Sequence, residues 1–86
     1  MLSREIAIKN KTGLHARPAA EFVKEAAKFK SAITIDFKDK KINGKSIIHV
    51  LSAGIAAGST ITLSADGEDE EQAVETLAAV ISKFEE

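Results

Sequence analysis

Hydrophobic and polar positions alternate along four short stretches of this chain, which predicts four β-strands. Residues 2–8 place Ile6 and Ile8 on one face, and residues 32–37 and 60–65 alternate more regularly. A hairpin turn at residues 38–40 is expected to lead into a short strand at residues 41–43. The lysines of this last strand suit a sheet edge, where charge discourages pairing with other chains.

Three other stretches repeat apolar residues every three or four positions, which predicts helices. The first runs from residue 16 to about residue 29, and the last opens at residues 67–69. Between them a short helix follows Ser46, because serine is a good N-cap residue. The apolar positions of the two longer helices are Ala19, Ala20, Phe22, Val23, Ala26, Ala27 and Phe29, and then Ala73, Val74, Leu77, Val80, Ile81 and Phe84.

The order strand, helix, strand, strand, helix, strand, helix predicts one α+β domain over residues 1–86. Strands with one apolar face imply a mostly antiparallel four-stranded sheet with the helices packed on one side. We expect the last strand to lie between the two strands that the first helix connects, as in a split β-α-β unit.

The composition excludes several functional classes. The 86 residues are 44% hydrophobic and include two histidines but no cysteine, so a packed core is expected and disulfides and thiolate metal sites are excluded. We expect neither a metal nor a cofactor. No stretch suits a membrane span or a signal peptide, which predicts a soluble cytoplasmic protein. A formal net charge of −1 argues against nucleic-acid binding.

The charges are unevenly distributed, with cations in the first third of the chain and acidic residues in the last quarter. One interpretation is an ordinary solvated surface, with acids helping to start the last helix. The other is a basic rim around a phosphate site, suited also to acidic partner proteins. The cations concerned are Lys9, Lys11, Arg17, Lys24, Lys28 and Lys30.

The segment Gly-Leu-His-Ala-Arg-Pro-Ala at residues 13–19 carries the most informative chemistry. Pro18 is tolerated in the first turn of a helix, so His15 is expected at or just before a helix N-terminus. There the backbone N–H groups of Ala16 and Arg17 and the helix dipole favour an anion. Arg17 adds a charged fork of donors that matches phosphate oxygens. A neutral imidazole in such surroundings is suited to accept a phosphoryl group, although a histidine before a helix is more often a surface residue or a modest cap.

The chain has neither a Gly-rich nucleotide loop nor an acidic cluster of the kind that holds magnesium beside phosphates. A protein with a phosphorylatable histidine but no donor-binding site should receive phosphate from another protein and pass it on. These features therefore favour a carrier over a self-sufficient enzyme.

Residues 13–19, together with Gly-Lys-Ser-Ile-Ile at residues 44–48, resemble the two signatures of the HPr family. These are the histidine-containing phosphocarrier proteins of the bacterial phosphoenolpyruvate:sugar phosphotransferase system, and the likeness, to the low-GC Gram-positive type, covers essentially the whole chain. The resemblance implies an open-faced β-sandwich of four antiparallel strands under three helices, and we expect a monomer. It also implies that enzyme I phosphorylates His15 on Nδ1 and that enzyme IIA domains then receive the group during sugar uptake.

Ser46 has two compatible interpretations. As an N-cap it would stabilise the short helix by about 1 kcal/mol. The resemblance implies that an HPr kinase/phosphorylase also phosphorylates it, and a phosphate at a helix N-terminus is electrostatically tolerated. We expect the modified protein to be a weaker substrate of enzyme I and, by the resemblance, to bind a catabolite-control repressor.

Apolar residues around Ser46 suggest a docking surface. Ile47, Ile48 and Leu51 cannot all face inward on so short a helix, so at least one is exposed, with or without a function. The resemblance favours docking and extends the surface to the first helix, at Ala16, Ala20 and Lys24. His49 departs from the expected family pattern, and we expect it to tune this surface.

A regulatory paralogue that binds partners without carrying phosphate is the main alternative. His15 and Arg17 argue against it, because known paralogues of that sort lose the histidine. A paralogue in a nitrogen-linked branch of the system is a further possibility, which the Ser-Ile-Ile sequence at residues 46–48 weakly disfavours. A stand-alone enzyme is disfavoured by the missing cofactor and nucleotide motifs.

Overall fold

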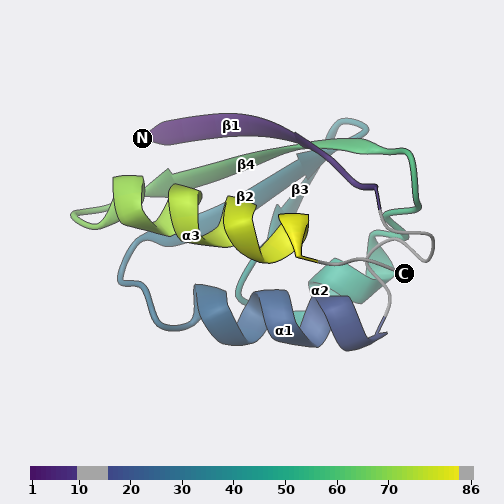
Figure 1. The fold of residues 1–86 in the computed structure, drawn as a ribbon, viewed down its shortest axis with the longest axis horizontal. Coiled ribbons are helices and arrows are strands. Elements are labelled where there is room, and N and C mark those ends of the chain that lie inside the picture. Colours follow the sequence, from purple (N-terminus) through teal and green to yellow (C-terminus); the bar gives the residue numbers. More distant parts are fainter. Residues whose placement is uncertain (10–15, 84–86) are drawn as a thin grey trace.

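The computed structural model of the chain describes residues 1–9 and 16–83. Its elements follow the predicted order (Figure 1). They are β1 (Leu2–Ala7), α1 (Ala16–Ala26), β2 (Ala32–Phe37), β3 (Lys40–Asn43), α2 (Ile47–Ser52), β4 (Thr60–Asp66) and α3 (Glu70–Ser82).

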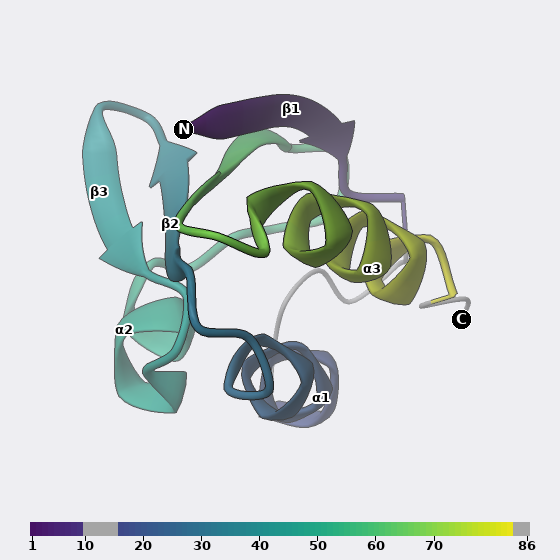
Figure 2. The ribbon, with the colours of Figure 1, turned by 90° about the vertical axis from the view of Figure 1, so that its left-hand side faces the viewer.

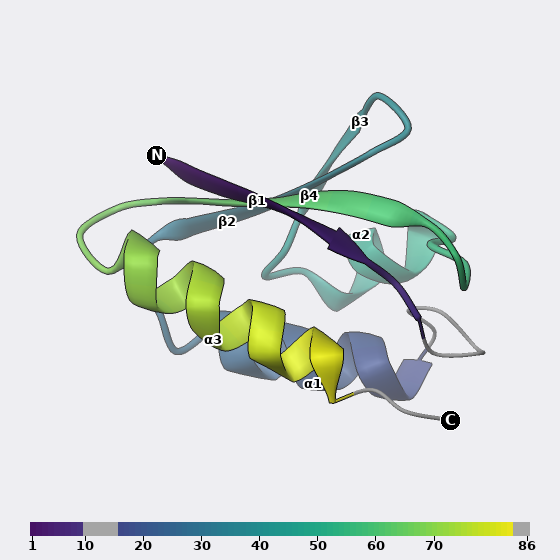
Figure 3. The ribbon, with the colours of Figure 1, turned by 45° about the horizontal axis from the view of Figure 1, so that its top comes forward.

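The four strands form one sheet in the order β1-β4-β2-β3, with every neighbouring pair antiparallel. Because β4 lies between β1 and β2, those two strands run parallel to each other, as the split β-α-β prediction requires. All three helices cover the same face of the sheet, and the other face is left open (Figure 3). The predicted α+β open-faced sandwich is therefore confirmed.

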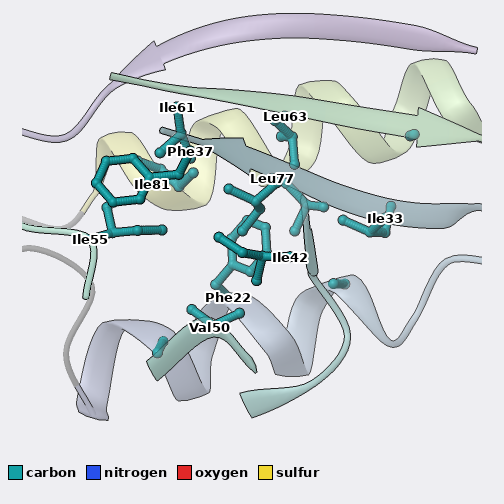
Figure 4. Close-up of a cluster of buried hydrophobic side chains, with 14 of the residues drawn as sticks. Phe22, Ile33, Phe37, Ile42, Val50, Ile55, Ile61, Leu63, Leu77 and Ile81 are labelled. Carbon is teal, nitrogen blue, oxygen red and sulfur yellow. The ribbon is translucent and has the colours of Figure 1, made fainter. Parts of the chain in front are cut away.

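The core lies between the sheet and the helices. Alternate residues of β2 and β4 point toward the helical layer, and Ile35 pairs with Leu63 at the centre of the sheet. Phe22 of α1 and Leu77 of α3 are fully buried against them (Figure 4). The strand positions that point to the open face are mostly polar. An apolar surface for binding a partner is therefore expected on the helical layer.

The turn between β2 and β3 consists of Lys38 and Asp39, because Phe37 pairs directly with Lys40. Both turn residues have positive φ, 49° and 67°, as a two-residue type I′ hairpin requires. The predicted hairpin is confirmed, although the turn contains no glycine. It leaves β3 as an edge strand, as the lysines indicated.

The first helix ends earlier than the sequence pattern predicts. It stops at Ala26 instead of about residue 29, and the N–H groups of Lys28 and Phe29 donate to carbonyls only three residues back. Phe29 nevertheless packs half-buried against the core. The apolar pattern in the sequence therefore extends beyond the last helical residue, because Phe29 contacts the core from the turn that follows α1.

The segment after α1 is fastened to the start of α3 by Asp69. The Asp69 carboxylate accepts hydrogen bonds from the N–H groups of Lys30 (2.9 Å) and Ser31 (3.0 Å) and from the buried Ser31 hydroxyl. Gly67 permits this approach, because a Cβ there would lie 2.7 Å from the Ser31 Cα. Asp69 occupies the N-cap position of α3, but its side chain makes no capping hydrogen bond. Its carboxylate instead bonds to residues 30 and 31, which are distant in the sequence.

These hydrogen bonds predict how acid affects stability. The Ser31 hydroxyl, followed by the Lys30 N–H, lowers the pKa of Asp69 below its usual 3.8. A carboxylate with a lowered pKa in the folded state contributes stability above its unfolded pKa, and that contribution is lost as pH falls through the folded pKa. We expect Asp69→Asn to lower the free energy of unfolding at pH 7 and to reduce its decline below about pH 4, as measured by urea unfolding across pH.

Glu68→Gln is the matched control for Asp69→Asn, because the exposed Glu68 carboxylate makes only a surface ion pair with Lys30 (3.5 Å). The control should unfold like the parent at every pH. An Asp69→Asn protein with the parent's stability and acid profile would show that the Asp69 hydrogen bonds contribute nothing to folding.

Candidate functional site

The start of α1 carries the first group of predicted site residues. Ala16 is the first helical residue, so His15 directly precedes the helix in the chain, although His15 itself lies outside the described residues. Pro18 is buried in the first turn, as its type allows, and Ala16 and Arg17 are exposed. No acidic residue occupies this turn. The N–H groups of Ala16 and Arg17 lack intrahelical partners, and an anion there would be stabilised by them and by the helix dipole.

The Arg17 side chain is exposed at the surface, where it can contact a ligand. It forms no salt bridge with any carboxylate of residues 1–9 and 16–83. A planar guanidinium can donate two parallel hydrogen bonds to a phosphoryl group. The position thus combines a fixed cation with the positive end of a helix.

The basic rim is smaller than the sequence suggests. Lys28 pairs with Glu25 at 3.1 Å, and Lys30 pairs with Glu68 at 3.5 Å, so two of the cations are partly neutralised. Lys9 and Lys24 are exposed and make no such pair within the described chain, and Lys11 lies outside it. Arg17 and Lys24 are therefore the exposed cations that α1 itself carries.

The second motif, residues 44–48, is held firmly in place. The N–H of Gly44 donates to the Ile33 carbonyl at 2.8 Å, and a Cβ on Gly44 would lie 2.6 Å from Ile33 Cγ2, so only glycine fits without movement. The Lys45 ammonium donates to the Phe29 carbonyl at 2.7 Å, which ties the motif to the end of the first helical segment. The motif thus fixes the entry into α2 against both the sheet and the α1 segment.

Ser46 caps α2, as predicted. Its backbone is extended (φ −114°, ψ 114°), and its hydroxyl oxygen accepts a long hydrogen bond of 3.4 Å from the His49 N–H. The Ser46 side chain is only partly buried, and it is therefore partly exposed at the start of the helix that it caps.

The short α2 helix divides its apolar residues between core and surface. Val50 is fully buried and Ile47 packs half-buried against the core, whereas Ile48 and Leu51 are 70% and 41% exposed. Ile48 and Leu51 are thus two of the exposed large hydrophobic residues of the described chain. Ile48 and Leu51 therefore face solvent, whereas Ile47 is only partly exposed.

The structure brings the two helical parts of the site together. α1 and α2 contact each other and lie side by side in the helical layer (Figure 2). Ala20 and Lys24 of α1 are exposed, as are Ile48, His49 and Leu51 of α2. The predicted docking residues other than Ile47 therefore lie at the surface of two adjacent helices.

The sequence pattern predicts neither of two long-range contacts that hold the helical segments in place. Asp69 accepts hydrogen bonds from residues 30–31, and the Lys45 ammonium donates to the Phe29 carbonyl. The sequence held no signal for either contact, because Asp69 and Lys30 are separated by 39 positions and Lys45 and Phe29 by 16.

Within residues 1–9 and 16–83 no group of three or more His, Asp or Glu side chains is placed to hold a metal ion. In the same region, no helix has the length and apolar character needed to cross a membrane.

The fold and the two motifs agree with a single protein family. A model of the family described as the PTS HPr component phosphorylation site matches residues 2–83, which is nearly the whole chain. The chain belongs to the HPr family, as the two motifs indicated.

Individual relatives fall into two groups. The chain is 51% identical to the HPr-like protein Crh of Halalkalibacterium halodurans, covering 96% of this chain and 99% of the relative. It is 46% identical to the phosphocarrier protein HPr of Buchnera aphidicola, covering 99% and 100%.

Solved structures agree with the fold. The crystal structure of HPr-C-His from Thermoanaerobacter tengcongensis is 52% identical, with a TM-score of 0.94, over 98% of this chain and 96% of that one. A structure described as an HPr dimer from the same organism is also 52% identical, with a TM-score of 0.78 and complete coverage of both chains.

Proposed function

We propose that this protein carries phosphoryl groups between proteins of the sugar phosphotransferase system. In this role His15 accepts the group from phosphorylated enzyme I and passes it to enzyme IIA domains. The observation that carries the proposal is the start of α1 directly after His15, with Arg17 exposed and no acid in the first turn. Membership of the HPr family supplies the chemistry expected at that position.

The transfer step follows from ordinary phosphoryl chemistry. The neutral Nδ1 of His15 attacks phosphorus as the bond from phosphorus to the donor breaks, and the donor leaves with the electron pair of that bond. Arg17 and the N–H groups at the start of α1 would stabilise the charge on the phosphoryl oxygens. Transfer to an enzyme IIA domain is the same step with this protein as donor, so no cofactor is consumed.

The direct test is charging of the protein by enzyme I and phosphoenolpyruvate, followed by intact mass measurement. We expect a gain of one phosphate that mild acid removes, because a phosphohistidine is acid-labile. His15→Ala should gain nothing, whereas the matched control His49→Ala should gain the same phosphate as the parent. A folded parent protein that gains no phosphate would overturn the proposal.

Regulation through Ser46 is a separate part of the proposal. An HPr kinase/phosphorylase would phosphorylate the partly exposed hydroxyl at the start of α2, and the product would bind a catabolite-control repressor. The cap position supports this part, since the helix N-terminus tolerates the added charge. The phosphate should survive mild acid and be absent from Ser46→Ala; phosphate on that variant would contradict the assignment.

Docking is proposed to use the surface formed by Ala16, Ala20 and Lys24 of α1 with Ile48 and Leu51 of α2. We expect Ile48→Ser to raise the KM of enzyme I for this protein by about tenfold, because a central apolar contact typically contributes 1–2 kcal/mol. Since Ile48 is 70% exposed, thermal unfolding should barely change. Ala79→Ser on α3 is the control, and an unchanged KM in Ile48→Ser would remove Ile48 from the docking surface.

The regulatory alternative is favoured by one observation, the 51% identity to an HPr-like protein Crh. A purely regulatory protein would accept phosphate on Ser46 from the kinase but none from enzyme I. The charging experiment therefore separates the two functions.

The oligomeric state is a further proposal. We propose a monomer as the carrier form, since the docking helices are exposed in the single chain. A relative from Thermoanaerobacter tengcongensis is described as a dimer. Sedimentation equilibrium at micromolar concentration measures the state directly, and a stable dimer would contradict the prediction.

A further inference from the structure

A groove of about 450 Å³ lies between β3 and α2, beside the proposed docking surface. Figure 2 shows these two elements on the same side of the molecule, away from α3. The groove is lined by Lys40, Lys41, Ile42, His49, Ser52 and Ala53. Among the residues that the structure describes, no carboxylate lines it.

The groove has an apolar floor and a cationic rim. Ile42 is 5% exposed and Ala53 is half-buried, whereas Lys40, Lys41 and His49 are exposed. Lys40 pairs with the buried Phe37, so it stands on the face of the sheet that carries the helices. The rim therefore combines the Lys40 ammonium of β3 with the His49 imidazole of α2.

Nearby acidic residues do not neutralise this rim. Asp36 pairs across the strands with Lys41, so both side chains belong to the open face of the sheet, and Lys41 lines the groove from the strand edge; Asp39 lies in the turn. Within the described chain, Lys40 and Lys41 form no salt bridge. By contrast, the groove between α1 and α3 is lined by Glu21, Glu25 and Glu75 with a single lysine. The positive groove is thus a local feature of a protein whose net charge is −1.

The edge position of β3 adds backbone groups that an extended chain could use. In an antiparallel ladder, alternate residues bond to the partner strand, and the residues between them direct their N–H and C=O groups outward. Because the Phe37–Lys40 pair closes the two-residue turn, the outward residue next to it is Lys41. A strand of four residues is roughly 13 Å long, enough for a four-residue extended segment alongside it.

We propose that this groove receives an acidic, extended segment of a protein partner that docks on α2. The idea rests on the docking role proposed for α2 but does not require phosphoryl transfer. Side chains at every second position of such a segment would contact the Ile42 and Ala53 floor or the cationic rim. An isolated phosphate suits the groove less well, because the cations are exposed and no buried donor converges on one point. The lysines would still discourage pairing with another basic edge strand.

The test uses an eight-residue synthetic peptide of alternating glutamate and valine, with blocked ends, followed by NMR of the 15N-labelled protein. We expect saturable shift changes at residues 40–43 and 49–53. Removing the exposed cation should weaken binding by up to about fivefold in Lys40→Gln, since an exposed ion pair contributes up to about 1 kcal/mol. Lys28→Gln, with the same change of charge elsewhere, should bind within twofold of the parent.

Three results would overturn the proposal: no saturable shifts at millimolar peptide, equal binding by Lys40→Gln and the parent, or shifts centred on Arg17 and Ala20. Equal shifts with inorganic phosphate at the same concentration would assign the groove to small anions and also contradict it. His15→Ala should bind the peptide like the parent. Failure of charging and failure of groove binding are therefore separate outcomes.

Discussion

Arg17→Glu is expected to slow charging of His15 by phosphorylated enzyme I by about 100- to 1,000-fold. Loss of one donor that stabilises developing charge typically has an effect of this size, and the new carboxylate adds repulsion of the phosphoryl oxygens. Arg17 is exposed and holds no described ion pair, so folding should be little affected. The measurement is the single-turnover rate of charging, with thermal unfolding recorded for the same samples.

Two further variants show whether the effect comes from Arg17 specifically. Arg17→Lys keeps the charge but loses the planar fork of donors, so its rate should fall between those of the parent and Arg17→Glu. Lys28→Glu, on the segment beyond the far end of α1, should charge nearly as fast as the parent. A rate for Arg17→Glu within twofold of the parent would remove Arg17 from the phosphate site.

Phosphorylation of Ser46, or its mimic Ser46→Asp, is expected to lower kcat/KM for charging of His15 by roughly 10- to 100-fold. Phosphate adds nearly two negative charges beside Ile48 and Leu51, the apolar residues proposed for docking. The fold should survive, because the charge lies at the start of α2, where the helix dipole is favourable. Steady-state charging by enzyme I at low salt measures the effect.

Ser46→Ala separates loss of the cap from gain of charge. This variant loses the hydrogen bond from the His49 N–H and should be about 1 kcal/mol less stable, yet it should be charged at the parent rate. If Ser46→Ala and Ser46→Asp were charged equally slowly, helix destabilisation would explain the effect instead of charge.

Most of the fold could be predicted from the sequence, because its determinants are local. Alternation along residues 32–37 and 60–65 placed Ile35 and Leu63 on the buried face. The cap at Ser46 could likewise be predicted from residue type and the apolar residues that follow. The residue at which α1 ends could not be predicted. Phe29 packs against the core from a turn, and its carbonyl accepts a hydrogen bond from Lys45, which lies far along the chain.

The site was predictable in its chemistry but less so in its surroundings. Arg17, Pro18 and Ser46 stand where residue type and spacing place them. The sequence could not decide which of Ile47, Ile48 and Leu51 faces solvent, because that depends on how α2 packs against the core. The neutralisation of Lys28 and Lys30 and the anchoring by Asp69 depend on the three-dimensional packing and were missed.

The carrier role as a whole is tested most directly by onward transfer from isolated phosphorylated protein. The protein is charged, freed of enzyme I and phosphoenolpyruvate, and mixed with an enzyme IIA domain, and the intact masses of both proteins are followed. We predict that this protein loses one phosphate while the enzyme IIA domain gains one in equal amount. Phosphate that stays on this protein, or is released to water without appearing on the enzyme IIA domain, would contradict the account.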